Sequence, residues 1–301
     1  MAGKTYRLIE QTSPSIDSLD RDKSIVLVNI SPIEGHGPHL PLGVDFLNGE
    51  YFVDSIARLI NQKIPAFDVV IVPGFPIGSQ VYRFPGSLWI SNSTLFSLAC
   101  GLGESLAQFG FRRIFMISGH GAPKDIVAID TACKKISRKF DIHMSNLSGS
   151  MAVKFLDGEF ADRISKKLSK PLSVQDLDIL KKDFHGGWWE TSMMLLLHPA
   201  LVSETYKNLQ TKEKTPETKR EKPGYFGSPA MATVEFARAS LEVMTEEAIT
   251  AIEKCLSNKP PGAVLVSPLY RMIVLRPYFR RNLVIAVSLA LIILAGLIFM
   301  L

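Results

Sequence analysis

Hydrophobic positions along the chain follow two patterns, short continuous runs and longer segments with an apolar residue every three to four positions. The runs at about 24–31, Asp68–Val72 and Arg113–Ser118 predict strands covered on both faces. The three-to-four spacing predicts helices. These are expected over Phe46–Gln62, 94–109, Asp125–Phe140, Glu190–His198 and about 233–256, with a charged helical lobe over 150–182. The alternation of strands and helices predicts an α/β fold with a mostly parallel sheet.

The last apolar segment differs from the others because it is longer and carries no charge. Leu283–Leu301 contains one serine among apolar residues, and Arg276, Arg280 and Arg281 precede it. At about 1.5 Å per residue, such a helix is roughly 28 Å long, close to the thickness of the membrane hydrocarbon. We therefore expect a transmembrane tail anchor, with the larger N-terminal domain in the cytoplasm. The alternative is a buried core helix at the end of a soluble domain.

Composition and charge narrow the class of protein. The chain has 301 residues, enough for a domain of about 250 residues with a full core. Its formal net charge of +5 is mild, and the basic stretches lack interleaved aromatic residues, so we expect no nucleic-acid partner. Three widely spaced cysteines, Cys100, Cys133 and Cys255, favour a reducing compartment. The N-terminal residues contain no apolar stretch typical of a secretory signal.

These boundaries divide the chain into four expected parts. Residues 1–23 are a polar extension, and 24–257 form the main domain. Residues 258–282 are a juxtamembrane linker, and 283–301 are the anchor. Within the main domain, the polar run from Lys207 to Lys222 is expected to be a linker or an insertion.

The densest candidate chemistry lies directly after the first predicted strand. Glu34, His36, His39 and Asp45 fall within twelve residues that also contain several glycines and prolines. Residues two apart in an extended chain point to the same side, so Glu34 and His36 can converge on one site. Carboxylates together with imidazoles are typical ligands of Zn²⁺ or Mn²⁺. The alternative is a turn whose polar residues have no shared role.

Two later stretches supply further candidate ligands. His120 stands between two glycines at the end of the third predicted strand. Loops that follow parallel strands open at the same edge of the sheet, so His120 is expected near Glu34, His36 and Asp45. Glu190 begins a buried helix, where it either binds metal or simply favours the helix dipole. Trp188 and Trp189, in the same glycine-rich stretch, either wall a substrate pocket or belong to the core.

Five motifs in this order resemble the creatininase (creatinine amidohydrolase) family over roughly residues 24–257. They are ExHGPHLPLGxD at Glu34–Asp45, FPG at Phe84–Gly86, GHG at Gly119–Gly121, HxGxxETSMML at His185–Leu195 and GxxGxPxxAT at Gly224–Thr233. The resemblance implies a three-layer α/β/α sandwich with a divalent metal centre. The metal would be Zn or Mn, with Fe also compatible, as one or two ions per chain. It further implies hydrolysis of C–N bonds in a small cyclic or linear amide, and a homo-oligomer, commonly a hexamer.

Carried over to this chain, the resemblance assigns roles to particular residues. Glu34, Asp45 and His120 would hold one metal ion, and His36, Asp45 and Glu190 the other. His185 would donate or relay a proton, with Glu190 as its catalytic neighbour. The substrate would contact residues of three loops, namely Ser79, Trp188, Trp189 and His39.

The chain also departs from the family pattern around its second histidine motif. Ser118 and Pro123 replace asparagines, Ala122 stands where some members have a metal-binding glutamate, and Val81 and Trp188 stand where many have His and Glu. Two functions are therefore open. The first is a membrane-tethered amidohydrolase that uses a metal-activated water. The alternative is a catalytically inactive protein of the same fold that serves as a membrane-tethered binding or scaffold subunit.

Overall fold

A five-stranded parallel sheet forms the centre of the molecule. The computed structural model describes residues 3–214, 224–257 and 265–299. The strand order is β1-β3-β2-β4-β5, and every neighbouring pair is parallel. The strands are β1 (Thr5–Arg7), β2 (Ser24–Ile30), β3 (Asp68–Phe75), β4 (Arg113–Ile117) and β5 (His143–Asn146). The prediction of a parallel-sheet α/β fold is confirmed.

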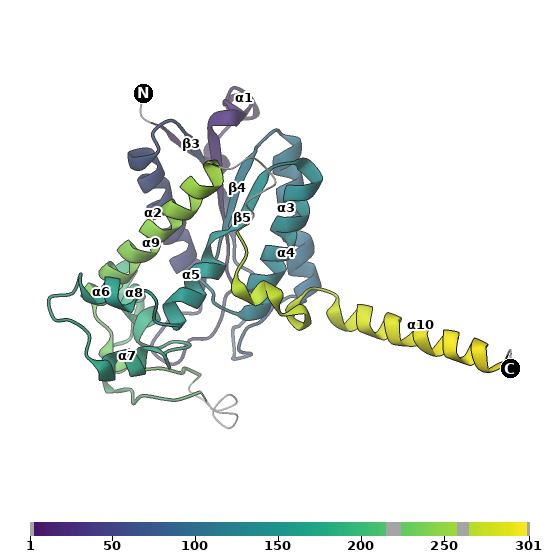
Figure 1. Ribbon diagram of the computed structural model, residues 1–301. Helices are drawn as coiled ribbons and strands as arrows, with labels where there is room; N and C mark the ends of the chain where they lie inside the picture. Colours follow the sequence, from purple (N-terminus) through teal and green to yellow (C-terminus); the bar gives the residue numbers. More distant parts are fainter. Residues whose placement is uncertain (1–2, 215–223, 258–264, 300–301) are drawn as a thin grey trace.

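Helices cover both faces of the sheet and create two separate cores (Figure 1). Successive side chains of a strand point to opposite faces. Ile25 and Leu27 of β2 therefore join one core, and Val26 and Val28 join the other. The first face carries α2 (Val44–Lys63), α5 (Leu147–Leu156), α8 (Trp188–Leu197) and α9 (Val234–Leu256). The second face carries α3 (Asn92–Gln108) and α4 (Pro123–Phe140).

Three local features differ from the sequence expectations. Residues Thr5–Arg7 of the N-terminal extension add an edge strand, fixed where Val69 N donates to Lys4 O at 2.8 Å. The hydrophobic pattern does not predict β5, because its HMSN sequence is short and three of its four residues are polar. The expected lobe over 150–182 consists of α5 and two short helices, α6 (Ala161–Ser165) and α7 (Val174–Leu180). Gly158 separates α5 from α6 with a positive φ of 78°.

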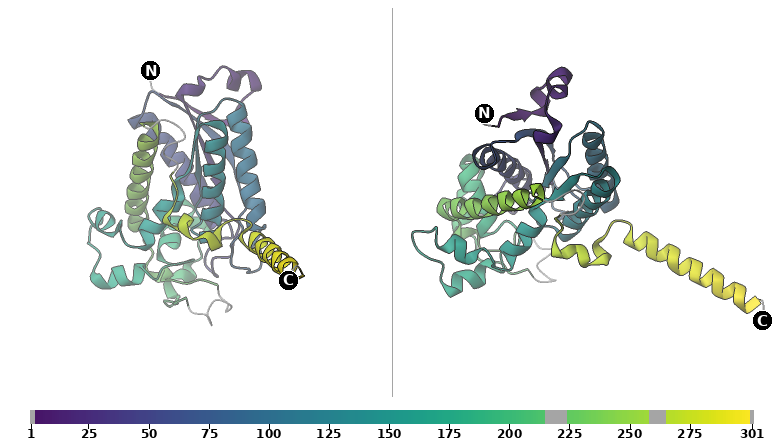
Figure 2. Two further views of the ribbon diagram at one scale, coloured as in Figure 1. Left: turned by 45° about the vertical axis from the view of Figure 1, so that its right-hand side comes forward. Right: turned by 45° about the horizontal axis from the view of Figure 1, so that its top comes forward.

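The C-terminal part of the chain first crosses the α4 layer and then leaves the domain. Ser267 N donates to the Asp130 carboxylate of α4 at 2.9 Å, and the Tyr278 ring packs edge-on against Phe96, with centroids 5.9 Å apart. Two short 3-10 helices, Pro268–Arg271 and Ile273–Leu275, lie in this crossing segment. Helix α10 (Phe279–Phe299) then extends away from the sheet layers in every view (Figure 2).

The expected tail anchor at 283–301 requires correction. Within residues 3–214, 224–257 and 265–299, no helix is both long and apolar enough to cross a membrane. The predictions of a transmembrane helix, of tethering and of a membrane location with a cytoplasmic domain are therefore wrong. They rested on the apolar run and the arginines before it, whereas a span needs a helix that is apolar over the whole hydrocarbon thickness. Residues 300–301 of that run, 258–264 of the expected linker and 215–223 lie outside the described residues.

Asp130 provides a test of how the crossing segment is held. Burial raises the pKa of its carboxyl from 3.8 to about 6, although the hydrogen bonds from Ser267 and Asn146 oppose this. The folded chain therefore binds this proton more tightly than the unfolded chain, and stability is lost as pH rises through the folded pKa. Relative to Asp130→Asn, which cannot ionise, the natural chain should lose about 1 kcal/mol of unfolding free energy between pH 5 and 7.5. Urea titrations measure this difference, and an unchanged difference between the two pH values would contradict it.

Candidate metal centre

The loop after β2 folds back on itself and brings three ionisable side chains together. Glu34 N donates to Leu42 O at 2.9 Å, which closes the loop, and Gly35 N donates to Ser87 Oγ at 3.0 Å. The loop ends at α2, whose first turn contains Asp45. The side chains of Glu34, His36 and Asp45 are completely buried. The loop therefore places two carboxylates and one imidazole in the interior, beside the carboxyl end of the sheet.

Backbone carbonyls fix the orientation of two imidazoles. His36 Nδ1 donates to Glu34 O at 2.9 Å, and His120 Nε2 donates to Gln80 O at 2.9 Å, with both tautomers assigned from these partners. The other ring nitrogens face Asp45 from opposite sides. His36 Nε2 lies 3.4 Å from Oδ1, and His120 Nδ1 lies 3.1 Å from Oδ2. Asp45 thus stands between the two histidines and offers one oxygen to each.

Glu34 and Glu190 complete a group on each side of Asp45. Glu34 Oε2 is 3.4 Å from His120 Nδ1, and its other oxygen accepts from Tyr82 N. Glu190 Oε2 is 3.6 Å from His36 Nε2 and accepts from Gly186 N. Three combinations each bring potential ligand atoms within 4.8 Å of one another. They are Glu34, Asp45 and His120; His36, Asp45 and Glu190; and Glu34, His36 and His185.

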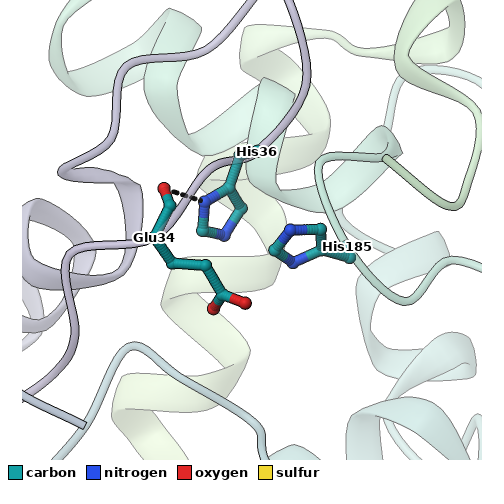
Figure 3. A group of neighbouring side chains, drawn as sticks. All are labelled: Glu34, His36 and His185. Carbon is teal, nitrogen blue, oxygen red and sulfur yellow. Dashed lines mark hydrogen bonds between the residues drawn. The ribbon is translucent and has the colours of Figure 1, made fainter. Parts of the chain in front are cut away.

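His185 lies against His36 at the edge of this cluster (Figure 3). The two ring centroids are 4.1 Å apart, and the Tyr82 ring covers His185 with centroids 4.5 Å apart. His185 Nε2 donates to Gly35 O at 2.7 Å. Burial, with His36 beside it, lowers the pKa of His185 well below its usual range. The ring is therefore neutral, and its unprotonated Nδ1 is available as a base or a ligand.

The electrostatics of the cluster are dominated by acidic groups in a dry environment. Burial raises the pKa of Glu34 to about 7, and the nearby Asp45 carboxylate adds to this. Burial alone would lower the pKa of His120, but the carboxylates of Asp45 and Glu34 raise it to about 10. The same balance, with Asp45 and Glu190, raises the pKa of His36 well above its usual range. The buried carboxylates therefore stay ionised only if positive charge lies beside them, either as protons on the imidazoles or as a bound cation.

The donor atoms fit a divalent metal. Four buried atoms of this cluster have no hydrogen-bond partner among the described residues, namely Glu34 Oε2, His36 Nε2, Asp45 Oδ1 and Asp45 Oδ2. Buried polar atoms are normally satisfied, so a converging set without partners is typical of a binding site. A mixture of carboxylate oxygens and imidazole nitrogens is what Zn²⁺ and Mn²⁺ accept.

Two further aspartates, which sequence reasoning missed, hold the loops of the centre. Asp125 at the start of α4 accepts from Ser79 N at 2.8 Å and Gln80 N at 2.9 Å. Because Gln80 O is the partner of His120, Asp125 helps to orient that imidazole. Asp183 accepts from the backbone of Trp188, Trp189 and Ser228 at 2.7 to 3.1 Å. The contacts of Asp125 with Ser79 and Gln80, and that of Asp183 with Ser228, join segments far apart in the sequence, so the sequence alone showed only an acid near the start of each helix.

Glycine is required where two of these segments approach each other. A Cβ on Gly119 would lie 2.1 Å from Asp45 O, so the loop after β4 can touch the first turn of α2 only without a side chain. A Cβ on Gly187 would lie 1.9 Å from Asp183 Oδ1. Gly119 thus allows the His120 loop to approach Asp45, and Gly187 allows Asp183 to approach the start of α8.

The residues expected to contact substrate have different environments. Trp189 lines a cavity of about 530 Å³ beside the cluster, and His120, His185 and Glu190 line it as well. Trp188 instead stacks on Phe236 in the core, with centroids 4.6 Å apart. Ser79 is bound to Asp125, and the buried His39 pairs through Nε2 with Thr191 Oγ1 at 2.9 Å. Of the four, only Trp189 is among the residues that line the cavity.

The chain is similar in sequence to one family model and to several known proteins. Residues 9–252 match the family model described as Creatininase: Creatinine amidohydrolase. Creatinine amidohydrolase of Pseudomonas putida is 25% identical over 191 residues, which cover 59% of this chain and 66% of that protein. The mycofactocin precursor peptide peptidase of Mycolicibacterium smegmatis is 25% identical over 177 residues, or 58% of each chain. The chain thus spans slightly less than two thirds of the length of these relatives.

Solved structures show the same fold. A structure titled "Creatininase Mn" superposes with a TM-score of 0.63 at 20% identity and covers 84% of this chain and 99% of its own. A creatinine amidohydrolase crystal structure gives 0.65, again at 20% identity, covering 84% and 98%. Creatininase structures carry Mn or Zn, as their titles state. Since the family model matches most of the chain and the fold agrees, the protein belongs to the creatininase family.

Proposed function

We propose that this protein is a metal-dependent hydrolase of C–N amide bonds in a small cyclic or linear amide. The observation that carries the proposal is the buried Asp45 carboxylate between the two oriented imidazoles of His36 and His120. A structural salt bridge would not need the additional carboxylates of the buried Glu34 and the partly buried Glu190 around it. The names of the relatives, creatinine amidohydrolase and precursor peptide peptidase, both describe cleavage of C–N bonds and support this class of reaction.

Two sets of ligands follow from the contacts. Glu34, Asp45 and His120 would hold one ion, and His36, Asp45 and Glu190 would hold a second, with Asp45 shared between them. The loop after β4 has Ala122 where some family members have a metal-binding glutamate. In this chain the first turn of α8 would supply a carboxylate instead, that of Glu190, which lies 3.6 Å from His36. The replacement at Ala122 therefore does not remove the second set. The inactive-scaffold alternative has no such use for the buried acids.

The metal and the protein residues have separate tasks. A divalent ion bound here would supply Lewis acidity, which makes water a better nucleophile and an amide carbonyl a better electrophile. His185 would take a proton at Nδ1 and return it to the departing nitrogen, because its Nε2–H is committed to Gly35 O. Tyr82 covers the ring of His185 and so limits access of bulk water to that proton. Glu190 would hold its ion and stay oriented by Gly186 N.

The departures around Ser118, Ala122 and Pro123 argue against creatinine itself. A homo-oligomer remains a prediction from the family resemblance.

The two ligand sets make different demands on metal binding. The purified full-length chain should bind about two Zn²⁺ or Mn²⁺ ions. Glu190→Gln should retain one ion, because Glu34, Asp45 and His120 are unaltered, whereas Asp45→Asn should weaken both. Elemental analysis after gel filtration measures the stoichiometry, and Glu104→Gln, an exposed carboxylate on α3, serves as the control. Absence of bound metal in the natural chain, or two ions in Glu190→Gln, would overturn the assignment.

The role of His185 in proton transfer can be separated from metal binding. His185→Asn should lower kcat by roughly 10²- to 10⁴-fold, the typical contribution of a general acid or base, with little change in metal content. The assay is amine release from a panel of cyclic and linear amides that includes creatinine. His198→Asn, at the C-terminal end of α8, is the matched histidine control. If His185→Asn loses metal in proportion to activity, His185 is a ligand and the relay assignment is wrong.

A further inference from the structure

The cavity beside the cluster has two chemically different sides. At one side lie the polar groups of His120, His185 and Glu190. The other side is formed by apolar side chains from four helices of the same sheet face (Figure 1). They are Phe52 of α2, Met151, Ala152 and Phe155 of α5, Trp189 of α8 and Met244 of α9. We call these six residues the apolar wall.

The apolar wall is a built feature and not a chance exposure of core residues. In α5, the residues that line the cavity are Ser148, Met151, Ala152 and Phe155, at helical positions i, i+3, i+4 and i+7. This spacing puts all four on one face of the helix. Trp189 is held between two aromatic neighbours, with its centroid 6.4 Å from that of Phe52 and 5.6 Å from that of Phe155. The wall therefore has a fixed shape.

Among the described residues that line the cavity, charge is confined to the cluster, to the buried Asp183, whose carboxylate is bound by backbone N–H groups, and to the exposed Lys214. The Lys214 ammonium lies 5.1 Å from the ring centroid of Phe184, which is 46% exposed, and 5.4 Å from that of Tyr82. These exposed residues mark the mouth of the cavity. The wall itself has Phe52, Met151, Phe155 and Met244 less than 9% exposed, so it lies in the interior.

The size of the cavity also bears on the substrate. Its volume of about 530 Å³ falls within the range of roughly 300 to 1,000 Å³ of pockets that enclose drug-sized ligands. A small polar amide would fill only the side next to the cluster and leave the apolar wall facing water. Covering that wall with an apolar group releases water and favours binding by roughly 25 cal/mol per Å² of buried apolar surface.

From these observations we infer that the substrate is an amide that carries an uncharged apolar group, aromatic or branched, which occupies the apolar wall while the amide lies at the cluster. This inference rests on the proposed function, because it takes the cluster as the place of the reacting bond. It adds the chemical class of the substrate and the residues that select it. Met151, Phe155 and Trp189 act as specificity-determining residues.

Hydroxamates provide a test that measures binding and not turnover, because their paired oxygens chelate Zn²⁺ or Mn²⁺. Calorimetry on the metal-loaded full-length chain would compare acetohydroxamate, 3-phenylpropionohydroxamate and the carboxylate-bearing succinic monohydroxamate. The phenyl compound should bind tenfold or more tightly than acetohydroxamate, given the area of roughly 100 Å² that its ring can bury. The succinic compound should bind less than threefold more tightly than acetohydroxamate.

Variants of the wall make the comparison specific. Met151→Gln should weaken binding of the phenyl compound about three- to tenfold and leave binding of acetohydroxamate unchanged. Met151→Leu should keep the preference for the phenyl compound. Ala152→Leu adds bulk on the same helix face and should exclude the phenyl compound while acetohydroxamate still binds, which keeps the test independent of Met151→Gln. Met272→Gln, at a residue 49% exposed and outside the cavity, should change neither.

The outcomes separate the inference from the proposed function. If acetohydroxamate binds but the phenyl compound binds no more tightly, the inference is overturned and the metal centre stands. A gain for the succinic compound alone would also overturn it, since the cavity would then select an anion through Lys214. If no hydroxamate binds although metal is present, the proposed function fails and the inference falls with it.

Discussion

The site depends on one buried carboxylate, that of Asp45, placed between two imidazoles. An unpaired carboxylate in the interior is too costly to keep ionised, so its position requires either cationic imidazoles or a metal. Each oxygen of Asp45 faces one histidine, at 3.1 and 3.4 Å. His36 comes from the same loop, whereas His120 comes from the loop after the neighbouring strand. Asp45 therefore contacts histidines from the loops that follow two adjacent strands.

The supports of this arrangement are themselves carboxylates that bind backbone N–H groups. Asp125 holds the segment at Gln80, whose carbonyl fixes the tautomer of His120. Asp183 gathers the backbone at the start of α8 and so positions Glu190. Neither aspartate belongs to a candidate ligand group. Orientation of ligands by such outer contacts is a general property of metal sites, because an imidazole with one nitrogen committed presents the other in a fixed direction.

Sequence reasoning identified the cluster but not its supports, for a physical reason. Glu34, His36 and Asp45 are close in sequence, and the rule that parallel strands end at one edge was enough to add His120. Glu190 was proposed from the family resemblance, because it was the carboxylate that the sequence offered for the second set of ligands, although a Glu at a helix start can also simply favour the helix dipole. The contacts of Asp125 with Ser79 and Gln80 and that of Asp183 with Ser228, by contrast, join residues about 45 apart, and no local pattern encodes such pairs. The same limit explains why Trp188 was wrongly grouped with Trp189 as a pocket residue. Trp189 lines the cavity, whereas Trp188 stacks on Phe236 in the core.

The two sides of the cavity come from different parts of the fold, and this separation has a consequence for function. The candidate ligands of the cluster lie on loops at the sheet edge and in the first turns of α2 and α8, where each charged side chain needs a partner of opposite charge. Half of the apolar wall lies on α5, which follows the last strand and whose wall residues are held by packing. Volume-conserving changes in packed apolar residues are tolerated, whereas loss of one partner of a buried charge is not. Under the proposed function, substrate preference can therefore change through the face of α5 that carries Met151 and Phe155 while the cluster around Asp45 stays the same.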